Sequence, residues 1–136
     1  MDPLELAQQV LKAQAFSAHV GAELTQFGDG VAVVTVPFRQ ELTQQDGFLH
    51  GGILAFAVDN AVTFAAGTVL GASVLTAGVS VTYLRPAKTS IRAVATVVGQ
   101  TRRQAVVRCE IYDDSDILVA AGTGTVTLVE AERKAL

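Results

Sequence analysis

The sequence predicts an α+β protein in which an antiparallel sheet wraps around one long apolar helix. Two observations predict this class. Residues 51–70 form a continuous apolar segment of helical length, and six β-type segments with hairpin-length connections give the element order α-β-β-α-β-β-β-β. The chain has 136 residues without a repeat, a low-complexity tract or a linker, so a single domain covering residues 1–136 is expected.

The N-terminal segment, residues 1–18, is predicted to contribute an additional helix over about 4–16. The start Asp2-Pro3 is typical of a helix N-terminus. The acidic character of this segment, with no apolar run after it, is unlike a targeting signal. Apolar side chains are available for one face of such a helix at Leu4, Val10, Leu11 and Ala15.

The strands are predicted from β-type segments that end at turn residues. Two strands are expected at 20–27 and 31–38, because these segments flank the turn signal Gly28-Asp29-Gly30. A polar loop then leads into the long helix. Four more strands end at proline, glycine or acidic turn residues, and they are expected at 75–84, 91–98, 104–112 and 117–129. The last residues, 130–136, are expected to form a frayed polar tail.

The long helix, residues 51–70 with Gly71 as its stop, is apolar on all sides. Such a helix must be covered on all sides, and one sheet covers only one of them. We therefore expect a second copy of the chain to cover the rest, most simply in a symmetric dimer. The segment is also long enough to cross a membrane. However, Asp59, Asn60 and Thr63 lie near its middle and no basic cluster flanks it, so a buried core helix is favoured.

Composition excludes several classes of function. The net charge is −3, so the charge balance does not support nucleic-acid binding. The single cysteine, Cys109, excludes an internal disulfide, fits a reducing cytoplasmic compartment and is expected to be a buried core residue. Only two histidines, His19 and His50, are present and no acidic pair lies at ligand spacing near them, so no metal site is expected.

The candidate catalytic residue is Asp59, the only formal charge between Gly47 and Leu84. A carboxylate surrounded by apolar side chains is costly to ionise, which makes it a candidate for chemistry. Gly51 and Gly52 leave N–H groups uncovered at the helix N-terminus, where the helix dipole favours negative charge. In the alternative interpretation, the glycines only allow a tight helix entry and Asp59 pairs with Arg85 or caps a neighbouring element.

The spacing of these residues predicts a site shared between two subunits. Asp59 lies eight residues after Gly51, which is about 12 Å along the axis of a helix. A carbonyl bound by the Gly51 N–H and attacked from Asp59 needs both groups within about 3 to 3.5 Å of the substrate. If both act in one reaction, Gly51 comes from one subunit and Asp59 from another.

Several nearby residues have two possible roles. Thr63 lies four residues after Asp59 on the same helix face, so its hydroxyl either holds a water or bonds back to the Asp59 carbonyl. His50 either donates to a substrate carbonyl oxygen or shapes the loop. Three phenylalanines at helical spacing either line an acyl pocket or pack in the core: Phe48, Phe56 and Phe64.

Basic residues are concentrated in one part of the sequence. Six of the ten fall in a stretch without an acid: Arg85, Lys88, Arg92, Arg102, Arg103 and Arg108. This pattern indicates either ordinary solvation of strand faces or a docking surface for a phosphorylated small molecule such as coenzyme A. On the second interpretation, the expected substrate-binding residues are Gly52, Arg85, Lys88, Arg102 and Arg103.

Together these motifs resemble the hotdog-fold acyl-CoA thioesterases, of the branch typified by the phenylacetate-degradation thioesterase. The matching segments are GFLHGGILAFAVDNA at 47–61 and GVSVTYLRPA at 78–87, and the element order from 20 to 129 also agrees. The resemblance implies a hotdog fold, hydrolysis of acyl-CoA with coenzyme A as part of the substrate and no separate cofactor, and a dimer or dimer of dimers with active sites across the interface.

The resemblance also implies roles for single residues. Asp59 corresponds to the catalytic carboxylate, as nucleophile or general base, and Gly51 to the amide that polarises the carbonyl. His50 precedes that amide, and Ser80 matches a hydroxyl that places water or substrate. Gln44 stands where relatives commonly have asparagine. Two alternatives stay open: a non-catalytic acyl-CoA-binding protein and, less favoured, a hydratase or dehydratase, because the histidine opens His-Gly-Gly rather than His-Phe-Pro.

Overall fold

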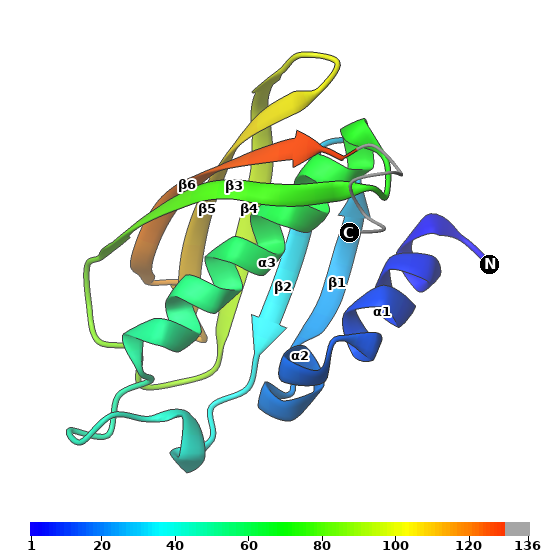
Figure 1. Cartoon of the computed structure of the whole chain (residues 1–136). Helices are drawn as coiled ribbons and strands as arrows, with labels where there is room; N and C mark the ends of the chain where they lie inside the picture. Colours follow the sequence, from blue (N-terminus) through cyan, green and yellow to red (C-terminus); the bar gives the residue numbers. More distant parts are fainter. Residues whose placement is uncertain (130–136) are drawn as a thin grey trace.

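The computed structural model describes residues 1–129, and the predicted tail at 130–136 lies outside the described residues. Figure 1 shows the path of the chain. The elements in chain order are α1 (Pro3–Ala13), α2 (Ala15–Val20), β1 (Glu23–Gly28), β2 (Val31–Val36), the 3-10 turn η1 (Gln40–Leu42), α3 (Gly51–Leu70), β3 (Val74–Tyr83), β4 (Ile91–Gln100), β5 (Gln104–Asp113) and β6 (Leu118–Leu128).

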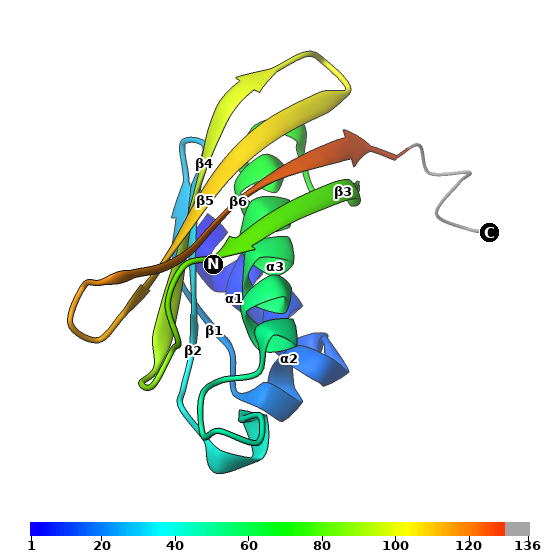
Figure 2. The same ribbon diagram turned by 90° about the vertical axis from the view of Figure 1, so that its left-hand side faces the viewer.

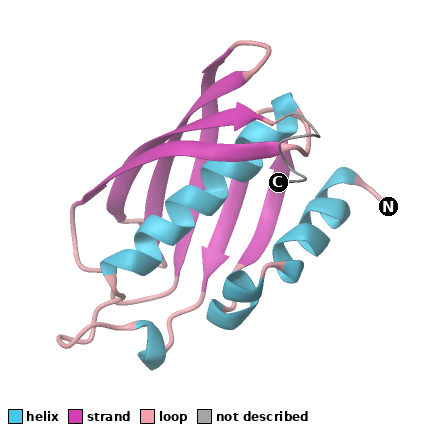
Figure 3. Cartoon of the chain, viewed as in Figure 1, coloured by secondary structure: helices cyan, strands magenta, loops and turns pink. Residues whose placement is uncertain are grey.

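All six strands form one antiparallel sheet with the order β1-β2-β4-β5-β6-β3. Strands β1 and β3 are therefore the two edges. Helix α3 lies across one face of the sheet and contacts every strand, as Figures 2 and 3 show from two directions. The predicted α+β class, with an antiparallel sheet around one long helix, is confirmed.

The N-terminal segment contains two short helices where one was predicted. Asp2 caps the first by accepting a hydrogen bond from the Glu5 N–H at 2.8 Å. The break lies at Gln14, whose backbone is extended and ends α1 while it begins α2. The physical reason is burial: α1 buries Leu11 and α2 buries Val20. Nine residues apart on one continuous helix, these side chains would point in opposite directions.

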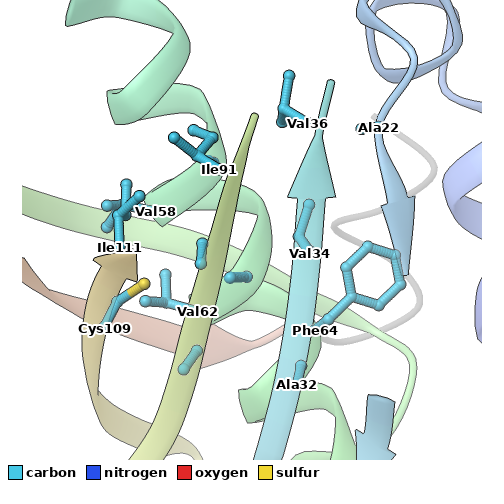
Figure 4. Packing of buried hydrophobic residues seen from close by; sticks show 14 of the residues in the cluster. Ala22, Ala32, Val34, Val36, Val58, Val62, Phe64, Ile91, Cys109 and Ile111 are labelled. Carbon is cyan, nitrogen blue, oxygen red and sulfur yellow. The ribbon is translucent and has the colours of Figure 1, made fainter. Parts of the chain in front are cut away.

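Helix α3 packs closely against strand β6, because β6 carries glycines where the helix crosses it. A Cβ at Gly124 would lie 2.7 Å from Val62 Cγ2, and one at Gly122 would lie 3.1 Å from Val58 Cγ1. Figure 4 shows Val58 and Val62 of α3 close to Cys109 of β5. Cys109 is buried, and this burial raises the pKa of its thiol to about 12. The glycines thus allow contact between helix and sheet without intervening side chains.

One face of α3 is left open by the sheet. The helix is long and apolar enough to cross a membrane by length and composition, but half of that span is buried inside the fold, as suits a core helix. The buried side faces the strands through residues such as Leu54, Val58 and Val62. Gly52 and Asp59 are exposed on the other side. This open face carries the candidate catalytic residue Asp59.

Candidate active site

The N-terminus of α3 leaves one backbone N–H available for a ligand. His50 is the N-cap, and its Nδ1 accepts a hydrogen bond from the Gly52 N–H at 2.9 Å. The Ile53 N–H donates to the His50 carbonyl at 2.9 Å. Within residues 1–129, the Gly51 N–H has no hydrogen-bond partner. A single donor therefore points outward at the positive end of the helix dipole.

Both glycines of the His-Gly-Gly motif lie close to neighbouring side chains. A Cβ at Gly51 would lie 3.3 Å from Cζ of Tyr83, whose hydroxyl donates to the Gly51 carbonyl at 3.0 Å. A Cβ at Gly52 would lie 3.1 Å from Nδ1 of His50. The motif thus leaves room for a phenol on one side and a capping imidazole on the other, and both groups hold the first turn in place.

His50 shapes the helix entry, which is one of the two roles predicted as alternatives, and its donation to a substrate carbonyl stays a prediction. Because Nδ1 accepts from the backbone, the proton of the neutral ring is assigned to Nε2. The side chain shapes the helix entry through one nitrogen, and the other is a donor at an exposed position. The structure therefore allows an Nε2–H donor close to the open Gly51 N–H.

Asp59 is exposed, which corrects the expectation of a carboxylate buried among apolar side chains. Adjacent helix positions differ by about 100°, so the neighbours Val58 and Asn60 are buried while Asp59 lies on the open face. In the described part of the chain Asp59 makes no ion pair. The proposed pairing with Arg85 is not formed, because the Arg85 guanidinium donates to the Leu118 carbonyl.

One threonine hydroxyl bonds to the Asp59 carboxylate, and a second bonds to the Asp59 backbone carbonyl and lies beside the first. Thr76 Oγ1 donates to Asp59 Oδ1 at 2.8 Å, and Thr63 Oγ1 lies 2.7 Å from the Asp59 carbonyl oxygen and 2.6 Å from Thr76 Oγ1. Two hydroxyls carry two protons, so only two of these three contacts hold a proton at one time. When Asp59 is ionised, Thr76 donates to the carboxylate, and Thr63 donates either to the backbone or to Thr76. The backbone contact foreseen for Thr63 is present.

Thr76 was missed in the sequence, where Ser80 was expected to supply the hydroxyl. The register between β3 and β6 shifts between Thr76 and Gly78, which is a β-bulge. Beyond it, Ser80 pairs with Thr123, while Gly122 and Gly124 on either side of Thr123 face α3. Ser80 therefore projects from the face of the sheet opposite α3. Its hydroxyl is thus directed away from Asp59 of the same chain, and its expected role in placing water or substrate stays a prediction.

Gln44 is used inside its own loop. Its side-chain oxygen accepts hydrogen bonds from the Asp46 and Phe48 N–H groups, and its backbone N–H donates to the Phe48 carbonyl at 2.8 Å. These contacts shape the loop that precedes His50. Among the described residues, no hydrogen bond joins the Gln44 amide to Asp59, and its expected catalytic role stays a prediction.

The basic residues do not form one surface. Arg85 and Lys88 lie in the connection after β3, at the same end of the sheet as the N-terminus of α3, and Lys88 lies 5.4 Å from the centre of the Phe48 ring. Arg102 and Arg103 lie in the β4–β5 turn at the opposite end, where the Leu128 N–H donates to the Arg103 carbonyl.

The other two basic residues of the stretch are paired with acids. Arg92 bonds to Asp116 at 2.8 Å and Arg108 to Glu110 at 3.2 Å. Among the residues that the structure describes, no group of three His, Cys, Asp or Glu side chains is placed to hold a metal ion. The arrangement thus offers a carboxylate with one hydroxyl partner and a separate N–H donor.

The three phenylalanines separate into different environments. Phe64 is buried and contacts Phe27 edge-to-face in the core. Phe56 is half-buried on α3 and forms an edge-to-face pair with Phe16 of α2, with ring centres 5.0 Å apart. Of the three, only Phe56 extends toward the region between α2 and the start of α3.

Comparison with known proteins identifies similar sequences and structures. The model of the thioesterase superfamily matches residues 46–120. A conserved protein from Pseudomonas aeruginosa is 31% identical, with a TM-score of 0.83 over 89% of this chain and 98% of that one. A thioesterase family protein from Silicibacter pomeroyi is 29% identical, with a TM-score of 0.83 over 90% and 95%. A point mutant of the phenylacetic acid degradation protein PaaI from Thermus thermophilus is 29% identical, with a TM-score of 0.77 over 84% and 98%.

Proposed function

The chain belongs to the thioesterase superfamily, and on that premise we propose that it hydrolyses acyl-CoA thioesters to a free acid and coenzyme A. Membership of this hotdog-fold family supports thioester hydrolysis in general. The similarity to the Thermus thermophilus PaaI protein favours the phenylacetate-degradation branch. A single buried cysteine fits a cytoplasmic location.

The observation that carries the proposal is the open Gly51 N–H at the N-terminus of α3. A tetrahedral intermediate of thioester hydrolysis carries negative charge on the former carbonyl oxygen, and a fixed N–H at a helix N-terminus stabilises that charge. The Tyr83 hydroxyl and the His50 cap hold the peptide of this turn in position. The donor therefore needs little rearrangement when charge develops.

The second reacting group is the partner subunit's Asp59. Asp59 and Gly51 of one chain are separated by about 12 Å along α3, so one chain does not bring them to the same carbonyl carbon. As a general base, the carboxylate would take a proton from water while the oxygen of that water attacks the carbonyl carbon. Collapse of the intermediate then breaks the carbon–sulfur bond, and the thiolate of coenzyme A takes up a proton. As a nucleophile, the carboxylate would first form an anhydride, which water hydrolyses.

The edge strand β3 supports the dimer that such a site needs. It presents an unpaired edge of ten residues whose exposed side chains include Leu75, Val79 and Tyr83. Long apolar edges pair readily with another chain. Two copies joined antiparallel along β3 would place the N-terminus of one α3 beside the middle of the other and bring the open helix faces together.

The same two-fold arrangement would bring basic residues from the two subunits close together. Arg85 and Lys88 lie at the end of the sheet near Gly51, and Arg102 and Arg103 lie at the other end. An antiparallel partner reverses these ends, so its β4–β5 turn would approach the first subunit's Arg85 and Lys88. We propose that both groups contact the phosphates of coenzyme A.

Thiol release from a panel of acyl-CoAs tests the proposed function. We expect the wild type to hydrolyse at least one acyl-CoA, and Asp59→Asn to lower kcat roughly 10²- to 10⁴-fold, the range of a lost general base. Size-exclusion chromatography should show the same oligomer for both proteins. Wild-type rates in Asp59→Asn would refute the assignment. Tight acyl-CoA binding without thiol release by the wild type would favour the non-catalytic alternative.

A further inference from the structure

We infer that the acyl group of the substrate binds in a pocket between α2 and the first turn of α3, and that Phe16 selects apolar acyl groups larger than acetyl. This inference rests on the proposed thioesterase function and adds the position and chemistry of the acyl site. The pocket has a volume of about 400 Å³. Pockets of roughly 300 to 1,000 Å³ are typical of small-molecule sites.

The position of the pocket connects it with the reacting carbonyl. His50 and Gly52, the residues on either side of the open Gly51 N–H, both line it. An acyl chain whose carbonyl oxygen accepts from Gly51 therefore begins at the mouth of this pocket. The β3 side of the same turn is already occupied, because the Tyr83 ring lies against Gly51. The chain is directed toward α2.

The walls of the pocket are suited to an apolar group. Phe16 and Val20 of α2, Leu42 of η1 and Ile53 of α3 supply apolar side chains. Of the polar lining residues, His19, Glu41 and His50 are exposed to solvent and Thr43 is half-buried. A hydrocarbon or aromatic acyl group gains free energy by covering these walls, whereas an acetyl group is too short to reach most of them.

Phe16 is the wall residue best placed to respond to the size of the acyl group. Its side chain is 53% exposed although it is aromatic, and its ring is held edge-to-face against Phe56 at 5.0 Å. Phe56 lies on α3 one turn after Gly52. An apolar acyl group in the pocket would cover the exposed ring, and the aromatic pair gives that surface a fixed geometry.

The wall formed by α2 is attached to the catalytic helix by a buried polar contact. The Asn60 amide donates to Ser17 Oγ at 3.2 Å, and Ser17 Oγ donates to the Gln14 side-chain oxygen at 2.6 Å. Asn60 and Ser17 are both buried. At the other end of α2, the Arg39 guanidinium donates to the His19 carbonyl at 3.1 Å. The pocket is therefore largely formed before substrate binds, because both ends of α2 are held.

The test compares acetyl-, hexanoyl- and benzoyl-CoA as substrates for the wild type and Phe16→Ala. We expect Phe16→Ala to lower kcat/KM roughly 10- to 100-fold for the larger acyl groups and to change it less than about twofold for acetyl-CoA. Phe16→Leu, which keeps an apolar side chain, should lie between the two. The relative losses for hexanoyl and benzoyl show whether the pocket prefers aliphatic or aromatic groups.

Phe38→Ala is the matched control, because Phe38 is also an exposed phenylalanine but does not line the pocket. It should leave all three substrates unchanged. Equal losses for acetyl and the larger groups in Phe16→Ala, or no loss at all, would overturn the acyl-pocket inference while the thioesterase function stands. Dissociation of the oligomer in Phe16→Ala would assign Phe16 to the subunit interface and overturn it too. A wild type without thiol release would instead refute the proposed function.

Discussion

Replacing Thr76 by valine tests how the structure prepares the Asp59 carboxylate. The valine side chain has the shape of threonine but no hydroxyl, so the substitution removes the donor that lies 2.8 Å from Asp59 Oδ1. It also removes the 2.6 Å contact with the Thr63 hydroxyl. Thr63 then keeps only its bond to the Asp59 carbonyl, and the carboxylate loses its one hydrogen bond from a described residue.

The size of the effect follows from the kind of hydrogen bond that is lost. A hydrogen bond to a charged group contributes about 1.5 to 3 kcal/mol. Asp59 is exposed in the single chain, so the lower end of about 1.5 kcal/mol applies, which corresponds to a rate change of about tenfold. Because Asp59 is proposed to act in the chemical step, the loss should be found in kcat with KM nearly unchanged.

The assay is steady-state thiol release with the best acyl-CoA of the panel, together with urea unfolding. Thr76 is half-buried at the edge of the sheet, so Thr76→Val should change the free energy of unfolding by only about 0.5 kcal/mol. Thr76→Ser keeps the hydroxyl and should retain most of the activity. Thr82→Val is the control on the same strand, since Thr82 is exposed and pairs with Ala121 on the sheet face away from α3.

Two results would refute this reasoning. A wild-type kcat in Thr76→Val would mean that the hydroxyl does not prepare the carboxylate for reaction. A kcat for Thr76→Ser as low as that of Thr76→Val would mean that the methyl group or the strand geometry, and not the hydrogen bond, carries the effect.

Two further predictions concern the core and its cysteine. Gly124→Ala should lower the free energy of unfolding by about 1 to 3 kcal/mol, because the added methyl group overpacks against Val62. The control Gly99→Ala, whose added methyl group meets no atom within 4 Å, should change this free energy by about 0.5 kcal/mol at most. Equal urea midpoints for the two variants would contradict the close packing. Cys109, with its pKa raised to about 12 by burial, should not react with a thiol reagent at pH 8 until urea unfolds the chain. Above pH 9 the unfolded chain releases this proton and the folded one keeps it until about 12, so stability should fall by about 1.4 kcal/mol per pH unit relative to Cys109→Ala.

Local sequence patterns were sufficient to predict most of the helices and strands. The apolar run at 51–70 is helix α3 with the predicted bounds, and the six predicted strands are present within a few residues of their expected ends. These features depend on periodicity and on turn residues that act over a few positions. The break at Gln14 was not predictable in this way, because no helix-breaking residue marks it. Packing of Leu11 and Val20 on the same core decides it.

The candidate site was likewise predictable only where it depends on local structure. The sequence alone determined that Asp59 stands on one helix with His-Gly-Gly at its start, and that the two groups lie too far apart to meet on one carbonyl, because helical rise is a local property. It could not determine which side of that helix the sheet covers. The tertiary structure placed Asp59 on the open face, exposed where burial was expected.

Which hydroxyl bonds to Asp59 was decided by a β-bulge, a feature that depends on pairing between distant strands. Simple alternation along β3 puts Thr76 and Ser80 on one face, and the bulge between Thr76 and Gly78 moves Ser80 to the other. A bulge is set by how β3 pairs with β6, and these strands are about forty residues apart in the chain. The sequence by itself determined the fold class and the residue types of the site. Only the tertiary structure decided which side chains meet, because register and covered faces arise from contacts between distant segments.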